Sequence, residues 1–390
     1  MSITAAAGFT AAGVACGIKP SGDPDLSLVA TTDGAPVTAA AVFTQNRMTA
    51  APVVTTNAHL TLTGGQAAAV VLNSGCANAA TGQPGLADAE AMCGLVAEAL
   101  GCQPTEVLVC STGLIGYRLP MDAIASGVPG LVADRAASAD AGAAAAEAIR
   151  TTDTHRKEAV ATCGGITIGG MAKGAAMLAP DMATMLAVLT TDAAVEPGPL
   201  TEILRAAVAG SFNAMSSDGC TSTNDTVILL ASGAAGPPPD AAAFASAVGD
   251  VCLDLARQMV GDAEGHTKVV TVRVTGALSD EDARRGARKV AESQLVKCSW
   301  YGQDPYWGRV ASELGSAGIA FEADKVSVRY GDLVVATGGV TADVDEAALA
   351  AYMACEHLEV TANLGLGDGT AHVLTNDLTH AYVDENMGTS

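Results

Sequence analysis

The chain has 390 residues, of which 49% are hydrophobic and 16% are charged, a composition that excludes a disordered protein. Its formal net charge is −22 and it has no Lys/Arg tract, so we expect no nucleic-acid partner and no membrane partner. Ten scattered cysteines without a CxxC pair indicate reduced thiols in a cytosolic protein, and no disulfide or zinc framework.

The N-terminal segment does not have the pattern of a targeting signal. Residues 1–18 carry no charged side chain and therefore lack the basic n-region of a signal peptide. The uncharged stretch between Arg47 and Asp88 is interrupted by polar residues, so we do not interpret it as a membrane span. These features predict a soluble, cytoplasmic protein.

The hydrophobic pattern predicts helices and strands that recur along the whole chain. Runs at helical spacing or rich in alanine predict helices, and short apolar or alternating runs predict strands. In chain order these are strand 68–73, helix 85–100, strand 106–112, helix 134–150, helix 200–208, strand 227–232, helix 240–260, strand 269–275, helix 279–292, a hairpin of 326–330 and 333–336, and strands 358–364 and 370–374. This order predicts a mixed α/β protein with layered sheets.

The stretch 171–188 contains a candidate nucleophile. Thr184 follows Ala183 inside an apolar run, with Lys173 upstream. If the bond between Ala183 and Thr184 were cut, the new α-amino group of Thr184 would be a general base for its own hydroxyl. The structural alternative is a threonine packed in the core or bonded to a nearby carbonyl group.

The same stretch resembles the self-cleavage motif of the ornithine acetyltransferase family, in which a Lys-Gly segment precedes Pro-x-Met-Ala-Thr-Met-Leu. The matching residues here are Lys173, Gly174, Pro180, Met182, Ala183, Thr184, Met185 and Leu186. Further segments match the family in the same order, from about Gly8 to the C-terminus. They are 73–82, 109–116, 150–157, 217–226, 262–268, 304–309 and 377–386.

This resemblance implies two chains, 1–183 and 184–390, that arise by self-cleavage of one precursor. Thr184 would take the acetyl group from N-acetylornithine and pass it to glutamate, giving N-acetylglutamate and ornithine. Acetyl-CoA is an alternative acetyl donor. Acyl transfer develops negative charge on the carbonyl oxygen, and fixed donors must stabilise it. Thr112 and Gly113, in the segment VCSTGLIG, match the family positions that supply these donors.

The resemblance also implies the residues that bind substrate. They are Thr152, Lys173, Thr184, Glu264, Asn386 and Ser390, with Glu264 near the substrate amine. Taken without the resemblance, Thr112 and Gly113 fit a strand end and Thr152 fits a helix end with capping residues. Lys173 fits a surface lysine with a solvated head, and Glu264 fits a solvated glutamate at a helix end. The segment 217–226 is interpreted as a buried hydrogen-bond network that supports the site from outside it.

The resemblance further implies a layered αββα sandwich of the self-processing N-terminal-nucleophile kind, without a metal or an organic cofactor. It implies an assembly of two α chains and two β chains. Three alternatives stay open: an aminopeptidase or amidase with the same self-generated threonine, a paralogue that serves a secondary-metabolite pathway, and a non-catalytic binding protein that is never cleaved.

Overall fold

Three β-sheets organise the residues that the computed structural model describes, 2–177 and 185–388. Two of the sheets belong to a first unit, residues 2–177, 185–213 and 220–262. The third belongs to a second unit, residues 214–219 and 263–388. None of the helices in these described residues is long and apolar enough to cross a membrane.

The first unit is built on a four-stranded and a six-stranded sheet. The four-stranded sheet consists, in spatial order, of β1 (Phe9–Val14), β2 (Leu26–Thr31), β5 (Ala69–Cys76) and β6 (Val107–Leu114), with only the β5–β6 pair parallel. The six-stranded sheet consists, in spatial order, of β4 (Gln66–Ala67), β3 (Val37–Phe43), β10 (Thr226–Gly236), β9 (Leu186–Ala193), β8 (Ile166–Lys173) and β7 (Lys157–Cys163). Its only parallel pair is β9 with β10.

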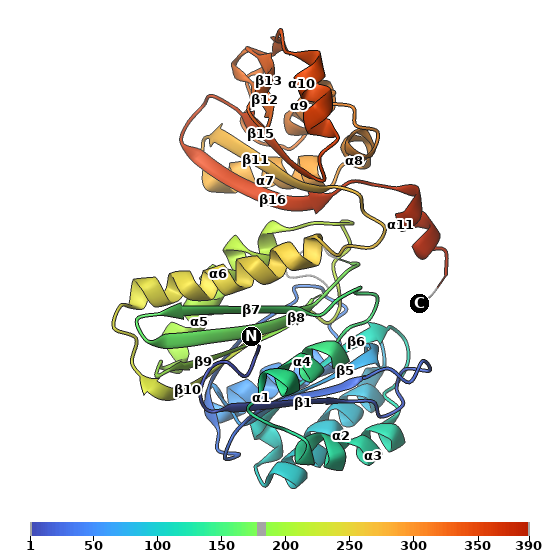
Figure 1. The fold of residues 1–390 in the computed structure, drawn as a ribbon, viewed down its shortest axis with the longest axis vertical. Helices are drawn as coiled ribbons and strands as arrows, with labels where there is room; N and C mark the ends of the chain where they lie inside the picture. The colour runs from blue at the N-terminus through green and yellow to red at the C-terminus, as the bar shows by residue number, and fades with distance from the viewer. Residues whose placement is uncertain (1, 178–184, 389–390) are drawn as a thin grey trace. The chain divides into compact units, whose positions relative to one another are not determined.

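The two sheets pack face to face between outer helices (Figure 1). Side chains from both sheets, such as Leu72 and Val188, share one buried cluster. On the far face of the four-stranded sheet lie α2 (Gly82–Leu100) and α3 (Met121–Ala133), while α5 (Pro197–Gly210) and α6 (Ala241–Val260) cover the six-stranded sheet. The predicted αββα layering is therefore confirmed in this unit. Two further helices, α1 (Ala51–Thr63) and α4 (Ala139–Ala148), pack against strands of the four-stranded sheet.

The second unit is a third sheet with helices on one face. In spatial order its strands are β14 (Val340–Thr341), β13 (Leu333–Thr337), β12 (Ser327–Tyr330), β15 (His357–Asn363), β11 (Val269–Ala277) and β16 (Gly369–Asn376). Its helices are α7 (Asp280–Ala291), α8 (Gln294–Tyr301), α9 (Trp307–Gly315), α10 (Glu346–Met353) and α11 (His380–Glu385). Three short 3-10 turns complete the described elements: η1 (Pro104–Glu106), η2 (Phe212–Ala214) and η3 (Ala323–Lys325).

The predicted helices and strands occur in the structure, and some of their boundaries differ. The helix predicted over 134–150 is shorter, because its N-terminus is set by Ser138, whose side chain accepts a hydrogen bond from the amide of Ala141. The strands predicted over 358–364 and 370–374 flank β11, which pairs parallel to β15 and antiparallel to β16. The predicted 326–336 hairpin is present as β12 and β13.

Candidate active site

The ends of β6, β8 and β9 meet in the first unit. Lys173, the last residue of β8, lies opposite Leu186, the first residue of β9. The Nζ atom of Lys173 donates to the Oγ1 atom of Thr112 on β6, at 3.3 Å. The predicted oxyanion residue therefore lies at the end of the sheet where β9 starts. Ala183 and Thr184, which are three and two positions before β9, lie outside the described residues.

Gly113 is held in a conformation that only glycine adopts easily. Its φ is 129°, and a Cβ atom added to it would lie 2.3 Å from the carbonyl carbon of Gly75. The ladder between β5 and β6 changes register beside it, at Cys76. A register shift of this kind changes the direction of the backbone at a sheet edge. The glycine at position 113 permits the shift, and the shift turns the chain after Thr112.

The hydroxyl of Thr112 is oriented by its lysine neighbour. An ammonium group has only donors, so the Thr112 oxygen must accept the hydrogen bond from Lys173. The hydroxyl proton of Thr112 is then directed to another acceptor. Both side chains are buried, with Lys173 3% and Thr112 5% exposed. A buried hydroxyl polarised by a cation is the kind of donor that stabilises an oxyanion.

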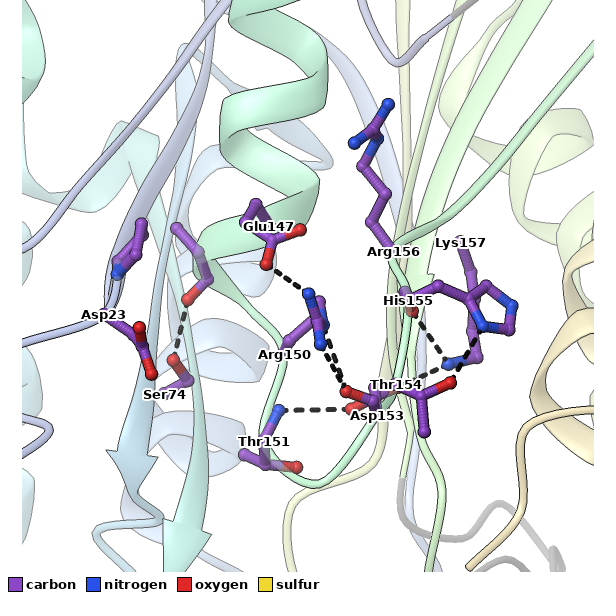
Figure 2. Close-up of polar contacts among 12 residues, drawn as sticks. Asp23, Ser74, Glu147, Arg150, Thr151, Asp153, Thr154, His155, Arg156 and Lys157 are labelled. Carbon is purple, nitrogen blue, oxygen red and sulfur yellow. Dashed lines mark hydrogen bonds and ion pairs between the residues drawn. The ribbon is translucent and has the colours of Figure 1, made fainter. Parts of the chain in front are cut away.

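Asp153 connects Lys173 to the segment 150–157, whose polar contacts are drawn in Figure 2. Its carboxylate accepts bonds from Lys157 Nζ and the Gly174 amide, both at 2.7 Å, and lies 3.9 Å from Lys173 Nζ. Burial raises the pKa of Asp153, but the ammonium groups of Lys173 and Lys157 outweigh burial and hold it well below its ordinary value. Asp153 is therefore a permanent anion between two lysines.

Lys157 is fully buried and has a second carboxylate partner. Its Nζ atom lies 2.6 Å from an oxygen of Asp262, which also accepts bonds from the backbone amide and the hydroxyl of Thr154. Burial raises the pKa of Asp262, yet the bonds from Lys157 and Thr154 bring the net shift below the ordinary value. The Asp153–Lys157–Asp262 chain of charges thus fixes the backbone that carries Thr152.

Thr152 itself is exposed, on the turn between α4 and β7. The amide of its neighbour Thr151 donates to Asp153 at 3.1 Å, and Arg150 donates to the backbone oxygen of Asp153 (Figure 2). These bonds hold the turn in one conformation. The structure therefore brings Thr112 and Lys173 into contact and links Thr152 to them through Asp153.

Glu264 and Asn386 meet in the second unit. The Nδ2 atom of Asn386, just after α11, donates to Glu264 Oε2 at 2.8 Å. Glu264 lines a cavity of about 140 Å³, together with the acidic side chains Asp218, Glu292 and Asp377 and the buried Lys297. Four carboxyl groups around one lysine favour a further cationic group. Ser390, the last predicted substrate residue, lies outside the described residues.

Sequence reasoning missed the charges that support this site. Asp153 and Lys157 lie in the segment 150–157, from which the sequence indicated only Thr152, and Asp262 is 105 residues from Lys157 in the chain. The available signal was the cluster of charges in 150–157, in a chain where only 16% of residues are charged. Among the described residues, no group of three or more His, Cys, Asp or Glu side chains is arranged to hold a metal ion.

Comparison with known proteins finds one family along nearly the whole chain. The model of the ArgJ family matches residues 10–388. The arginine biosynthesis bifunctional protein ArgJ of Thermobifida fusca is 48% identical over 390 residues, which cover 100% of both chains. The protein of the same description from Mycolicibacterium paratuberculosis is 50% identical over 395 residues, covering 100% of this chain and 96% of the relative. A solved structure, ornithine acetyltransferase from Mycobacterium tuberculosis complexed with ornithine, is 45% identical over 46% of this chain and 94% of that chain, with a TM-score of 0.42.

Proposed function

The chain belongs to the ArgJ family, and we propose that its own residues perform the acetyl transfer of that family as follows. The family membership confirms the predicted activity, a bifunctional ornithine acetyltransferase and glutamate N-acetyltransferase of arginine biosynthesis. The observation that carries the residue assignment is the contact between Lys173 Nζ and Thr112 Oγ1, beside the start of β9.

The chain is cut once before Thr184, which frees the α-amino group. In the first half-reaction, the hydroxyl of Thr184 then attacks the acetyl carbon of N-acetylornithine. The free α-amino group of Thr184 takes the hydroxyl proton and passes it to the leaving nitrogen of ornithine. An ester between the acetyl group and Thr184 forms as the C–N bond breaks. The amine of glutamate then attacks this ester and leaves as N-acetylglutamate, while the threonine hydroxyl is restored.

The oxyanion of each tetrahedral intermediate is stabilised by Thr112 and Gly113. The Thr112 hydroxyl accepts from Lys173 and has its proton available for a developing anion. Gly113 supplies a backbone donor in a segment whose path requires glycine. This assignment explains why a lysine is buried beside a threonine in a chain with so few basic residues.

Lys173 and Thr152 are the residues of the first unit that we assign to a substrate carboxylate. In the second unit, we assign Glu264 and Asn386 to a substrate amine. Thr184 and Ser390 are the two remaining residues that we assign to substrate binding. We further propose acetyl-CoA as an alternative acetyl donor, an assembly of two 1–183 chains with two 184–390 chains, and a cytoplasmic location.

Self-cleavage is tested by mass spectrometry of denatured protein. Wild-type protein should give two fragments, one ending at Ala183 and one starting at Thr184. Thr184→Ala should stay a single chain and lose acetyl transfer. An uncut wild-type protein with full activity would eliminate the α-amino group as the general base.

Competition between glutamate and water for the acetyl group distinguishes an acetyltransferase from a hydrolase. With N-acetylornithine as donor, glutamate should accelerate the release of ornithine and appear as N-acetylglutamate, with ping-pong kinetics. Release of ornithine at one rate with or without glutamate, accompanied by free acetate, would instead indicate an amidase.

A further inference from the structure

Two adjacent buried residues, Asn224 and Asp225, contact both strands on which the proposed chemistry depends. They precede β10 and lie in the segment 217–226, where the sequence predicted a polar network. Asn224 is 5% exposed and Asp225 is fully buried. Their side chains bond to different partners, Asn224 to the carbonyl groups of Ser111 and Ala77 and Asp225 to the amide of Met185.

Asn224 reaches from the six-stranded sheet to the four-stranded sheet. Its Nδ2 group donates to the carbonyl oxygen of Ser111 at 2.9 Å and to that of Ala77 at 2.6 Å. Ser111 directly precedes Thr112 on β6, and Ala77 lies in the loop after β5. Both hydrogens of one amide are therefore used to hold the backbone beside the oxyanion residue.

The amide of Asn224 is itself held in place. Its Oδ1 atom accepts from the Thr223 hydroxyl at 2.6 Å, and its backbone amide donates to the Ser222 hydroxyl at 3.1 Å. A fully bonded amide of this kind has one orientation, because either flip or rotation would leave buried partners unsatisfied.

Asp225 holds the strand that follows the cleavage site. Its Oδ1 atom accepts from the backbone amide of Met185 at 2.7 Å, directly after Thr184. The backbone amide of Thr226 donates to the carbonyl of Met185 at 3.2 Å, so both sides of this residue are bonded to the same segment. Burial raises the pKa of Asp225 well above its ordinary value, consistent with a side chain that acts as a neutral hydrogen-bonding group.

We propose that Asn224 and Asp225 are positioning residues that set the separation between the oxyanion strand β6 and the nucleophile strand β9. This inference rests on the proposed function, since it takes Thr112 as the oxyanion donor and Thr184 as the nucleophile. Neither side chain need touch substrate. Because a small displacement of a reacting group costs far more rate than affinity, their loss should lower kcat with little change in KM.

The first test compares Asn224→Asp with a matched control, Asn46→Asp. Aspartate has the shape of asparagine but lacks both N–H donors, so it releases Ser111 and Ala77. The amide of Asn46 donates to the carbonyl of Thr221 in the same segment, and among the described residues no hydrogen bond joins its side chain to β6 or β9. Each variant is assayed after mass spectrometry shows that it is cleaved, with Tm measured in parallel.

We expect Asn224→Asp to lower kcat by about 10²-fold while KM for N-acetylornithine and for glutamate changes by less than about threefold. The burst of ornithine that reports acetylation of the enzyme should slow equally. Asn46→Asp should keep the wild-type kcat. If Asn224→Asp keeps the wild-type kcat, whether or not its KM changes, the proposed role of Asn224 is overturned.

The second test uses Asp225 and does not depend on whether Asn224→Asp folds. Asp225→Asn keeps an oxygen that accepts from the Met185 amide, whereas Asp225→Ala removes it. If Asp225 acts by position, the asparagine variant should retain kcat within about threefold and the alanine variant should lose about tenfold or more. Equal losses in both variants would assign the effect to the carboxyl group itself and overturn the positioning role.

The activity of the wild-type enzyme separates failure of the proposed function from failure of the positioning role. A wild-type enzyme that is neither cleaved nor active in acetyl transfer overturns the proposed function together with this inference. A cleaved, active wild type whose kcat survives both Asn224→Asp and Asp225→Ala overturns the inference alone.

Discussion

Lys173 is a buried cation in a protein with a formal charge of −22. A surface lysine with a solvated head was the alternative, and its 3% exposure excludes this. Its Nζ atom lies 3.3 Å from Thr112 Oγ1 and 3.9 Å from a carboxylate oxygen of Asp153. Lys173 is one of the two ammonium groups that keep Asp153 ionised; the other, Lys157, is shared with Asp262.

Replacing Lys173 with methionine should therefore affect both affinity and rate. A charge-assisted bond to a carboxylate contributes roughly 1.5–3 kcal/mol, so kcat/KM for N-acetylornithine should fall by about tenfold or more. Because Thr112 also loses its donor, kcat should fall as well. Steady-state kinetics on cleaved protein measure both constants, with Lys289→Met on the surface of α7 as control. Unchanged constants would remove Lys173 from the site.

Lys297 is a second buried lysine, in the second unit. Its Nζ atom donates to the carbonyl groups of Ser217 and Asn376 and to the hydroxyl of Thr375, at 2.6 to 2.8 Å. These acceptors are neutral. Burial lowers the pKa of Lys297 to about 8, although the nearby carboxylates of Asp218, Asp377 and Glu292 act in the opposite direction.

This pKa shift predicts how stability changes at alkaline pH. Below about pH 8 the lysine is charged in both the folded and the unfolded chain, and above pH 10.5 it is neutral in both. Between these values only the unfolded chain binds the proton, so stability rises with pH. The free energy of unfolding of wild type, relative to Lys297→Met, should therefore increase by roughly 3 kcal/mol from pH 8 to 10.5. Denaturant titrations at several pH values measure it; a constant difference would contradict the assignment.

At the level of elements, longer helices with a periodic, alanine-rich or capped pattern were predictable, whereas α1 was not. Asp240 and Ser279 accept bonds from the first-turn amides of α6 and α7, and both helices match their predicted ranges closely. In contrast, α1 has many β-branched residues, which disfavour a helix. Tertiary bonds stabilise it instead: Thr56 donates to the carbonyl of Val109, and His59 contacts that of Val107.

The cap of α6 gives a prediction about stability alone. Asp240 accepts hydrogen bonds from the amides of Ala242 and Ala243 at 2.9 and 3.1 Å. Asp240→Ala should therefore lower the free energy of unfolding by about 1 kcal/mol, without changing kcat. Asp250→Ala removes the same charge from the same helix but no cap, and should have a smaller effect. Equal losses in the two variants, measured by denaturant unfolding, would contradict the capping role.

At the level of the whole molecule, the sequence predicted the fold class and layering, but not how the chain is divided. Residues 214–219 belong to the second unit although their neighbours on both sides belong to the first. The amino-acid composition does not change at residues 214–219, so the sequence does not mark this segment as part of the second unit. The bonds that define it, such as Ser217 with Asn376, join residues 159 apart, and periodicity within a short window carries no information on such pairs.

The net charge of the whole molecule should make its stability depend on salt. With 42 acidic and 20 basic residues, the folded chain holds like charges close together, and this repulsion is relieved on unfolding. Ion pairs on the surface contribute little that salt can remove. Raising NaCl from about 10 mM to about 300 mM shortens the Debye length below typical charge separations, so Tm should rise by several degrees. Near the isoelectric point of about 4.4 the net charge disappears, and the same salt step should have a much smaller effect. A Tm that falls with salt at neutral pH would show that attractive pairs, such as Arg118 with Asp88, outweigh the net repulsion.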